Sequence, residues 1–182
     1  MRFFINLCYL VMSPKMGWQD IAHENTPKDY LQSKTLVPML ALVALSSFFP
    51  IFSAEEHTLT ELIKYMICDT ASVFIGYVIS VYLLAVLNPE PAKDPQKYNL
   101  LHVYSTYVYV LLEVIVVISN VLDVFLGIGL IYLLPLLLVL IINAGTDAFD
   151  IDQEGKKDKF ALEVMCCTIL PFYGIRYIFN LF

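Results

Sequence analysis

The sequence predicts an all-α polytopic membrane protein, a bundle of about five transmembrane helices preceded by a short N-terminal interfacial helix. Of its 182 residues, 59% are apolar and only 15% are charged, and the mean hydropathy is +0.71. The surface of a soluble domain carries more charge than this. Apolar stretches long enough to cross a hydrocarbon core about 30 Å thick also recur along the chain. We therefore expect the lipid bilayer to surround most of the protein.

Residues 1–34 are predicted to form a cytoplasmic or interfacial headpiece. Residues 1–12 are almost entirely apolar, but they are too few to span a bilayer. We expect an uncleaved helix that lies in the interface. A cleaved signal peptide is the alternative, although Ser13-Pro14-Lys15 stands where such a signal has small residues. Trp18 and Ile21, three residues apart, are candidate interfacial anchors.

The remaining residues, 35–182, are predicted to form one transmembrane domain. Pro38 is compatible with the first span, because a proline in the first turn removes no needed hydrogen bond. Asn88 and the prolines after it end the second span, and Asn120 to Asp123 are expected to form a tight turn between the third and the fourth. The five predicted spans cover about residues 35–52, 62–87, 100–119, 124–143 and 160–182.

The basic residues predict the orientation, because cytoplasmic loops retain lysine and arginine. All of the 11 except Lys64 and Arg176 precede the first span or lie in the loops that join spans two to three and four to five. The N-terminus is therefore expected in the cytoplasm and the C-terminus outside it. The abundance of phenylalanine, tyrosine and lysine favours a bacterial chain, and hence the inner membrane.

Charged side chains within the predicted spans are the candidate functional residues, since a charge in hydrocarbon usually faces the bundle interior and a partner. Asp69, Glu113 and Arg176 lie six or seven residues from the predicted outer ends of their spans. We expect them at a similar depth, within about 10 Å of the outer interface, where the carboxylates can share Arg176 or a proton.

A polar stripe follows the third span. Its members recur at helical spacing and fall near one face: His102, Thr106, Tyr109, Glu113 and Asn120. One interpretation is a proton or ion path with His102 at its cytoplasmic mouth. The other is that the stripe hydrogen-bonds neighbouring helices, a common use of polar groups in membranes. Both remain open, and the second is the more general use.

Several function classes find no support in the sequence. No catalytic motif, phosphate-binding glycine loop or cofactor motif occurs, so we expect no enzyme activity and no cofactor. The four cysteines show no metal-ligand spacing, and we expect no metal site. A formal net charge of −6 does not suit nucleic acid as a partner.

Several short motifs follow one another along nearly the whole chain. They are the segment from Ser13 through Trp18 to Ile21 before the first span, Cys68-Asp69 and Gly76-Tyr77 in the second, and Lys157-Asp158-Lys159-Phe160 leading to Pro171 and Ile178-Phe179-Asn180. In this order of parts the chain resembles the Yip family, the Ypt/Rab-interacting membrane proteins, in its bacterial branch, with a partial glycine match at Gly76-Tyr77. The resemblance implies a five-helix bundle with a cytoplasmic N-terminus and supplies no activity.

We expect a non-enzymatic protein that organises the membrane or binds a protein partner through the headpiece and cytoplasmic loops, as a monomer or a homodimer. The alternative is a small proton- or ion-coupled transporter that uses the intramembrane Asp69, Glu113 and Arg176 group. Many secondary transporters contain two related halves, and five spans with no evident internal repeat do not suit that plan.

Overall fold

The computed structural model describes residues 2–24, 26–53, 57–89, 93–126, 141–146 and 157–181. All regular structure in these ranges is helical, which confirms the predicted all-α class. Four helices among the described residues are long and apolar enough to cross a membrane: Lys28–Phe52, Leu59–Leu87, Pro95–Leu126 and Asp158–Asn180. By the length and composition of these helices, the chain is a multi-pass membrane protein.

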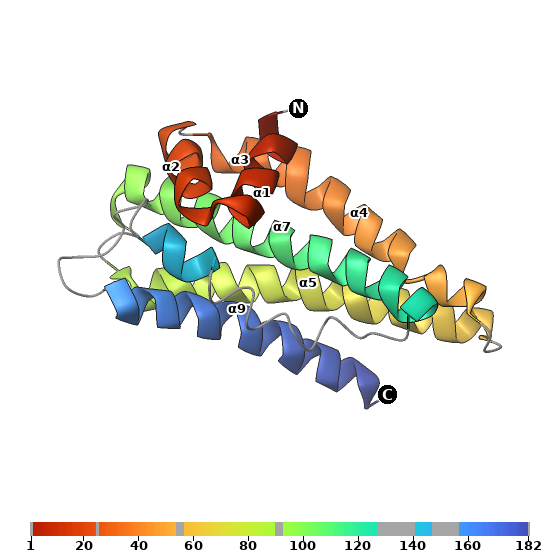
Figure 1. The fold of residues 1–182 in the computed structure, drawn as a ribbon. Helices are drawn as coiled ribbons and strands as arrows, with labels where there is room; N and C mark the ends of the chain where they lie inside the picture. Colours follow the sequence, from red (N-terminus) through yellow and green to blue (C-terminus); the bar gives the residue numbers. More distant parts are fainter. Residues whose placement is uncertain are drawn as a thin grey trace.

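The predicted headpiece, residues 1–34, begins with two helices packed on each other, α1 (Arg2–Met12) and α2 (Pro14–Glu24), and its last residues, 28–34, belong to the first long helix (Figure 1). They meet closely at Gly17, where an added Cβ would lie 2.8 Å from the backbone nitrogen of Leu10. Glycine is therefore needed for this approach.

The first long helix of the bundle begins earlier than expected. Its path runs through α3 (Lys28–Leu31), the π-helix η1 (Gln32–Leu36), α4 (Val37–Ser46) and the 3₁₀ turn η2 (Phe49–Phe52). The wide π turn lies just before Pro38, whose missing N–H interrupts the regular ladder of hydrogen bonds. Residue 35, where the first span was predicted to start, therefore lies in the π turn of a helix that begins at Lys28.

Helix α5 (Leu59–Leu87) starts three residues before its predicted position. Thr58 and Glu61 form a capping box, in which each side chain accepts a hydrogen bond from the backbone N–H of the other residue. The helix therefore begins in the acidic loop rather than at the first apolar residue.

Helix α7 (Pro95–Leu126) is longer at both ends than predicted. Asp94 accepts a hydrogen bond from the backbone N–H of Gln96 (2.9 Å), and Pro95 starts the helix. The predicted turn at residues 120–123 is wrong, because α7 continues through it. That segment contains neither glycine nor proline, and its polar residues do not break the helix. Most of the predicted fourth span, residues 127–140, lies outside the described residues.

Helix α9 (Lys157–Asn180) contains Pro171 within its length. It makes its most extensive contact with α5. The two helices run in opposite directions, as the hydrogen bond from Asn88, next to the end of α5, to Glu163, near the start of α9, shows. Figure 1 shows α4, α7 and α9 running in one direction and α5 in the other. Helix α7 is central, and its residues from 101 to 113 are all buried.

Helix α5 carries large apolar residues on its exposed face, as a span in lipid can. The exposed set includes Phe74, Ile75, Val78 and Tyr82. The buried face mixes apolar residues such as Val73 and Leu84 with small and polar ones, Asp69, Ser72, Gly76 and Ser80. Small residues at the interface are typical of helix packing in membranes.

Candidate functional site

Asp69 on α5 is the centre of a buried polar cluster that joins four helices. Its Oδ1 accepts a short hydrogen bond from the guanidinium of Arg176 on α9, with which it forms an ion pair. Its Oδ2 accepts from the hydroxyl of Ser47, just after α4 (2.8 Å), and from the amide of Asn120 on α7 (3.0 Å). Asn120 also donates to the hydroxyl of Ser46 (3.0 Å). The expected association of Asp69 with Arg176 is therefore present.

Glu113 does not join this cluster. The residue of α7 that reaches Asp69 is Asn120, seven positions farther along, or about 10 Å along the helix axis. Glu113 is fully buried, and neither carboxylate oxygen has a hydrogen-bond partner among the described residues. The prediction of a common depth was wrong because the end of span three was placed at residue 119, whereas α7 ends at Leu126.

Tyr109 connects helices instead of lining an open path. Its hydroxyl donates to the carbonyl of Thr168 on α9 (3.3 Å), and its ring meets Tyr77 of α5 edge to face at 5.4 Å. The Tyr77 hydroxyl in turn lies 3.1 Å from that of Thr106 and accepts from the amide of Gln32 at 2.6 Å. These bonds tie η1, α5, α7 and α9 together.

His102 lies toward the start of α7, as predicted, but it makes no polar contact there. Its ring packs edge to face on Tyr98 at 4.4 Å. Neither ring nitrogen has a hydrogen-bond partner within the described part of the chain. His102 and Glu113 are eleven residues apart, about 16 Å along the axis, so they do not touch.

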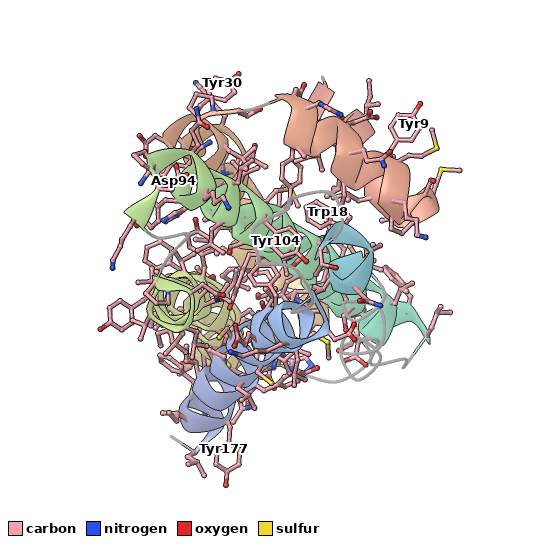
Figure 2. All side chains as sticks on the ribbon, turned by 90° about the vertical axis from the view of Figure 1, so that its left-hand side faces the viewer. Tyr9, Trp18, Tyr30, Asp94, Tyr104 and Tyr177 are labelled. Atoms are coloured by element: carbon pink, nitrogen blue, oxygen red, sulfur yellow. The ribbon has the colours of Figure 1, made fainter. Side chains whose placement is uncertain are left out.

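Trp18 is fully buried and does not face outward as an interfacial anchor would. Its indole N–H donates to the carbonyl of Ile141 (2.8 Å), and its ring packs on Tyr104 at 4.6 Å. Figure 2 shows Trp18 and Tyr104 directed toward each other in the interior. Ile21, 2% exposed, is buried as well. The predicted anchors thus face the bundle, because α2 packs against α7 and the segment 141–146.

Gly145 makes this packing possible. An added Cβ there would lie 2.6 Å from a ring carbon of Tyr104 and 2.8 Å from the indole of Trp18. The Tyr104 hydroxyl donates to the carbonyl of Ile142 (2.7 Å). The Tyr104 bond fixes the segment 141–146 on α7, and the Trp18 bond to Ile141 joins α2 to that segment in addition to the apolar contact.

The members of these hydrogen-bond networks that were not predicted from the sequence include serines and tyrosines, whose hydroxyl groups lie inside apolar stretches of the sequence. Ser46 and Ser47 stand together at the end of an otherwise apolar span, and Tyr104 and Tyr77 lie among other aromatic residues. The doublet of serines was the available signal, since a hydroxyl in a span needs a hydrogen-bond acceptor.

Comparisons with protein-family models, with curated proteins and with solved structures find no match to this chain. Among the described residues, no three histidine, cysteine, aspartate or glutamate side chains lie together as metal ligands would. The polar groups found here form two kinds of arrangement. One is a set of hydrogen bonds between helices, and the other is a pair of buried groups, Glu113 and His102, that those bonds do not use.

Proposed function

We propose that the chain is a non-enzymatic membrane protein that binds a partner protein through its headpiece, with the architecture of the Yip family and a place in a bacterial inner membrane. The observation that carries this proposal is the fixed docking of α2 through Trp18. Docking holds the outer face of α2 in one orientation, and the exposed polar residues of this helix are Lys15, Gln19, Asp20, His23 and Glu24. A surface that is already ordered loses less entropy when a partner binds.

The non-enzymatic part of the proposal is supported by how the polar groups are used. Asp69, Arg176 and Tyr109 each form a hydrogen bond to a helix other than their own. In the described part of the chain, no hydroxyl or thiol group hydrogen-bonds the ring nitrogens of His102 or the carboxylate of Glu113, as an activated nucleophile would. These groups stabilise a bundle on which a binding surface can be displayed.

The proposed topology has five crossings, with the N-terminus in the cytoplasm and the C-terminus outside. Helix α7 is described as far as Leu126, about 33 Å along the axis from Tyr104, and Ile142 lies beside Tyr104. The chain then enters α9 from the same end as α7. A fifth crossing between these points is part of the proposal, and the distribution of basic residues supports a cytoplasmic headpiece.

Site-specific photo-crosslinking in intact cells tests the binding surface. A photoreactive residue at Gln19, on the exposed face of α2, is compared with one at Lys64, which is exposed at the other end of the bundle. We expect a discrete protein adduct from position 19 alone, weakened when Asp20 and His23 are changed to alanine. An adduct of twice the chain mass identifies a second copy as the partner. No adduct at position 19 would contradict the proposal.

Proton-coupled transport is a second candidate, favoured by one observation: Glu113 and His102 are buried without hydrogen-bond partners among the described residues. A carboxyl group kept in hydrocarbon without a partner is costly, and such groups often serve proton relays. Proton uptake into liposomes containing the wild type and Glu113→Gln distinguishes the candidates. Flux that the variant loses supports transport, and equal uptake with empty liposomes excludes it.

A further inference from the structure

A polar cleft of about 690 Å³ opens among the ends of α4, α5, α7 and α9, away from the headpiece. Small-molecule sites typically occupy roughly 300–1,000 Å³. Polar and charged groups from all four helical segments line the cleft, among them Ser53, His57, Asp69, Asn120, Asp123 and Arg176. This space plays no part in the headpiece surface described above.

The floor of the cleft is the ion pair of Asp69 and Arg176, and the group in it that can still bind a ligand is the guanidinium. The two oxygens of Asp69 are occupied by Arg176, Ser47 and Asn120, so this carboxylate has little capacity left for a ligand. Arg176 differs, because a guanidinium carries five N–H donors and the bond to Asp69 uses only one of them. Its side chain is 26% exposed, and it lines the cleft. Within the described ranges its remaining donors have no hydrogen-bond partner, so they can bind an oxyanion.

The rim of the cleft offers an anion. Asp123, in the last turn of α7, is exposed and lines the same space. It forms no ion pair within the described part of the chain. A cation with spare donors and a carboxylate without a counterion therefore face one cleft from two different helices, α9 and α7.

This pair of charges selects against ligands of a single sign. Asp69 offsets the charge of Arg176, so the floor is a nearly neutral ion pair whose guanidinium still carries N–H donors, and Asp123 adds a negative charge beside it. A purely anionic ligand is repelled by Asp123, and a simple cation leaves the donors of Arg176 unused. A molecule with an oxyanion next to an ammonium group satisfies both. Arginine favours phosphate and carboxylate oxyanions because its planar donors match them in pairs.

We infer that this cleft binds a zwitterion of the phosphoethanolamine type, with its phosphate on Arg176 and its ammonium group on Asp123. The proposed outer end of the bundle lies at the level of the lipid headgroups, where phosphatidylethanolamine presents this chemistry. A soluble phosphoethanolamine compound presents it as well. The ligand class is the same in both cases, and the source is a matter for experiment.

The first test measures the Tm of the purified full chain in detergent with three soluble probes. These are glycerophosphoethanolamine, the anionic glycerophosphoglycerol and cationic ethanolamine. We expect only the zwitterion to raise the Tm. Asp123→Asn should keep the ligand-free Tm, because the side chain is exposed, and weaken the zwitterion about tenfold. Asp20→Asn, an exposed change on α2, is the matched control and should bind normally.

The second test distinguishes the two sources. Native mass spectrometry compares wild type and Asp123→Asn from vesicles of phosphatidylethanolamine mixed equally with phosphatidylglycerol. Retention of phosphatidylethanolamine by the wild type alone assigns the cleft to a lipid headgroup. A Tm response without lipid retention assigns it to a soluble zwitterion. The assignment is overturned if glycerophosphoglycerol raises the Tm equally, if no probe raises it, or if Asp123→Asn binds like the wild type.

Discussion

Asn120 donates a hydrogen bond to Asp69 across 51 residues of sequence, at 3.0 Å, and so joins the end of α7 to α5 at the level of the Arg176 ion pair. The same amide reaches Ser46, so one side chain links three helical segments. The cluster is therefore a shared joint of the bundle and not an isolated pair. Its members are expected to respond to mutation together.

Removing the charge of Asp69 alone should destabilise the protein more than removing the charges of Asp69 and Arg176 together. Asp69→Ala leaves Arg176 without its carboxylate in a mostly buried place, and we expect a loss of about 3 kcal/mol in the free energy of unfolding. The double variant Asp69→Asn with Arg176→Gln should recover part of this loss. Unfolding in mixed detergent, followed by circular dichroism, measures both. Equal losses in the two variants would show that the ion pair has no particular role.

Trp18→Phe should lower the free energy of unfolding by about 1–3 kcal/mol, because it removes the hydrogen bond to Ile141 and leaves a smaller ring in a fully buried site. Trp18→Ala should lower it by about 3–5 kcal/mol, since a large buried ring is lost. Tyr30→Ala is the control, because Tyr30 is 60% exposed and should matter little. Proteolysis of the headpiece in detergent reports its release. Similar effects of Trp18→Ala and Tyr30→Ala would contradict the docking described here.

Two glycine substitutions should have opposite consequences. Gly17→Ala places a methyl group 2.8 Å from the backbone of Leu10, which must separate α1 from α2 at a cost of about 1–3 kcal/mol. Gly174→Ala meets nothing within 4 Å, and alanine favours the helix, so it should be neutral or slightly stabilising. Hydrogen exchange in α1 separates the two cases. A neutral Gly17→Ala would mean that the headpiece helices are not closely packed.

Glu113→Gln should leave stability within about 1 kcal/mol of the wild type, because it removes no hydrogen bond or ion pair found among the described residues. Glu113→Leu should be equal or more stable, since a buried polar group without a partner is replaced by an apolar one. Thermal unfolding of the two variants in detergent is the measurement. A large loss in both would reveal a partner for this carboxyl group.

The all-α class and the intramembrane Asp69–Arg176 pair could be predicted because they depend on composition and on the cost of a lone charge in hydrocarbon. Helix ends were harder to predict. Asn120 and Asp123 resemble loop residues in the sequence, but α7 continues through them without a glycine or proline, and the tertiary bonds that satisfy Asn120 leave no local signal. The place of Trp18 was missed for a related reason, since its pairing with Ile141 spans 123 residues and leaves no local pattern.

The Asp69 cluster also has a consequence for biogenesis. Helices enter the membrane in chain order, so α5 is made well before α9, which supplies Arg176 107 residues later. Until then, Asp69 has only neutral partners from α4 and α7 in this cluster. The bundle therefore completes its electrostatic balance only when the last described helix inserts. A quality-control protease that recognises unpaired intramembrane charge would have its best opportunity in that interval.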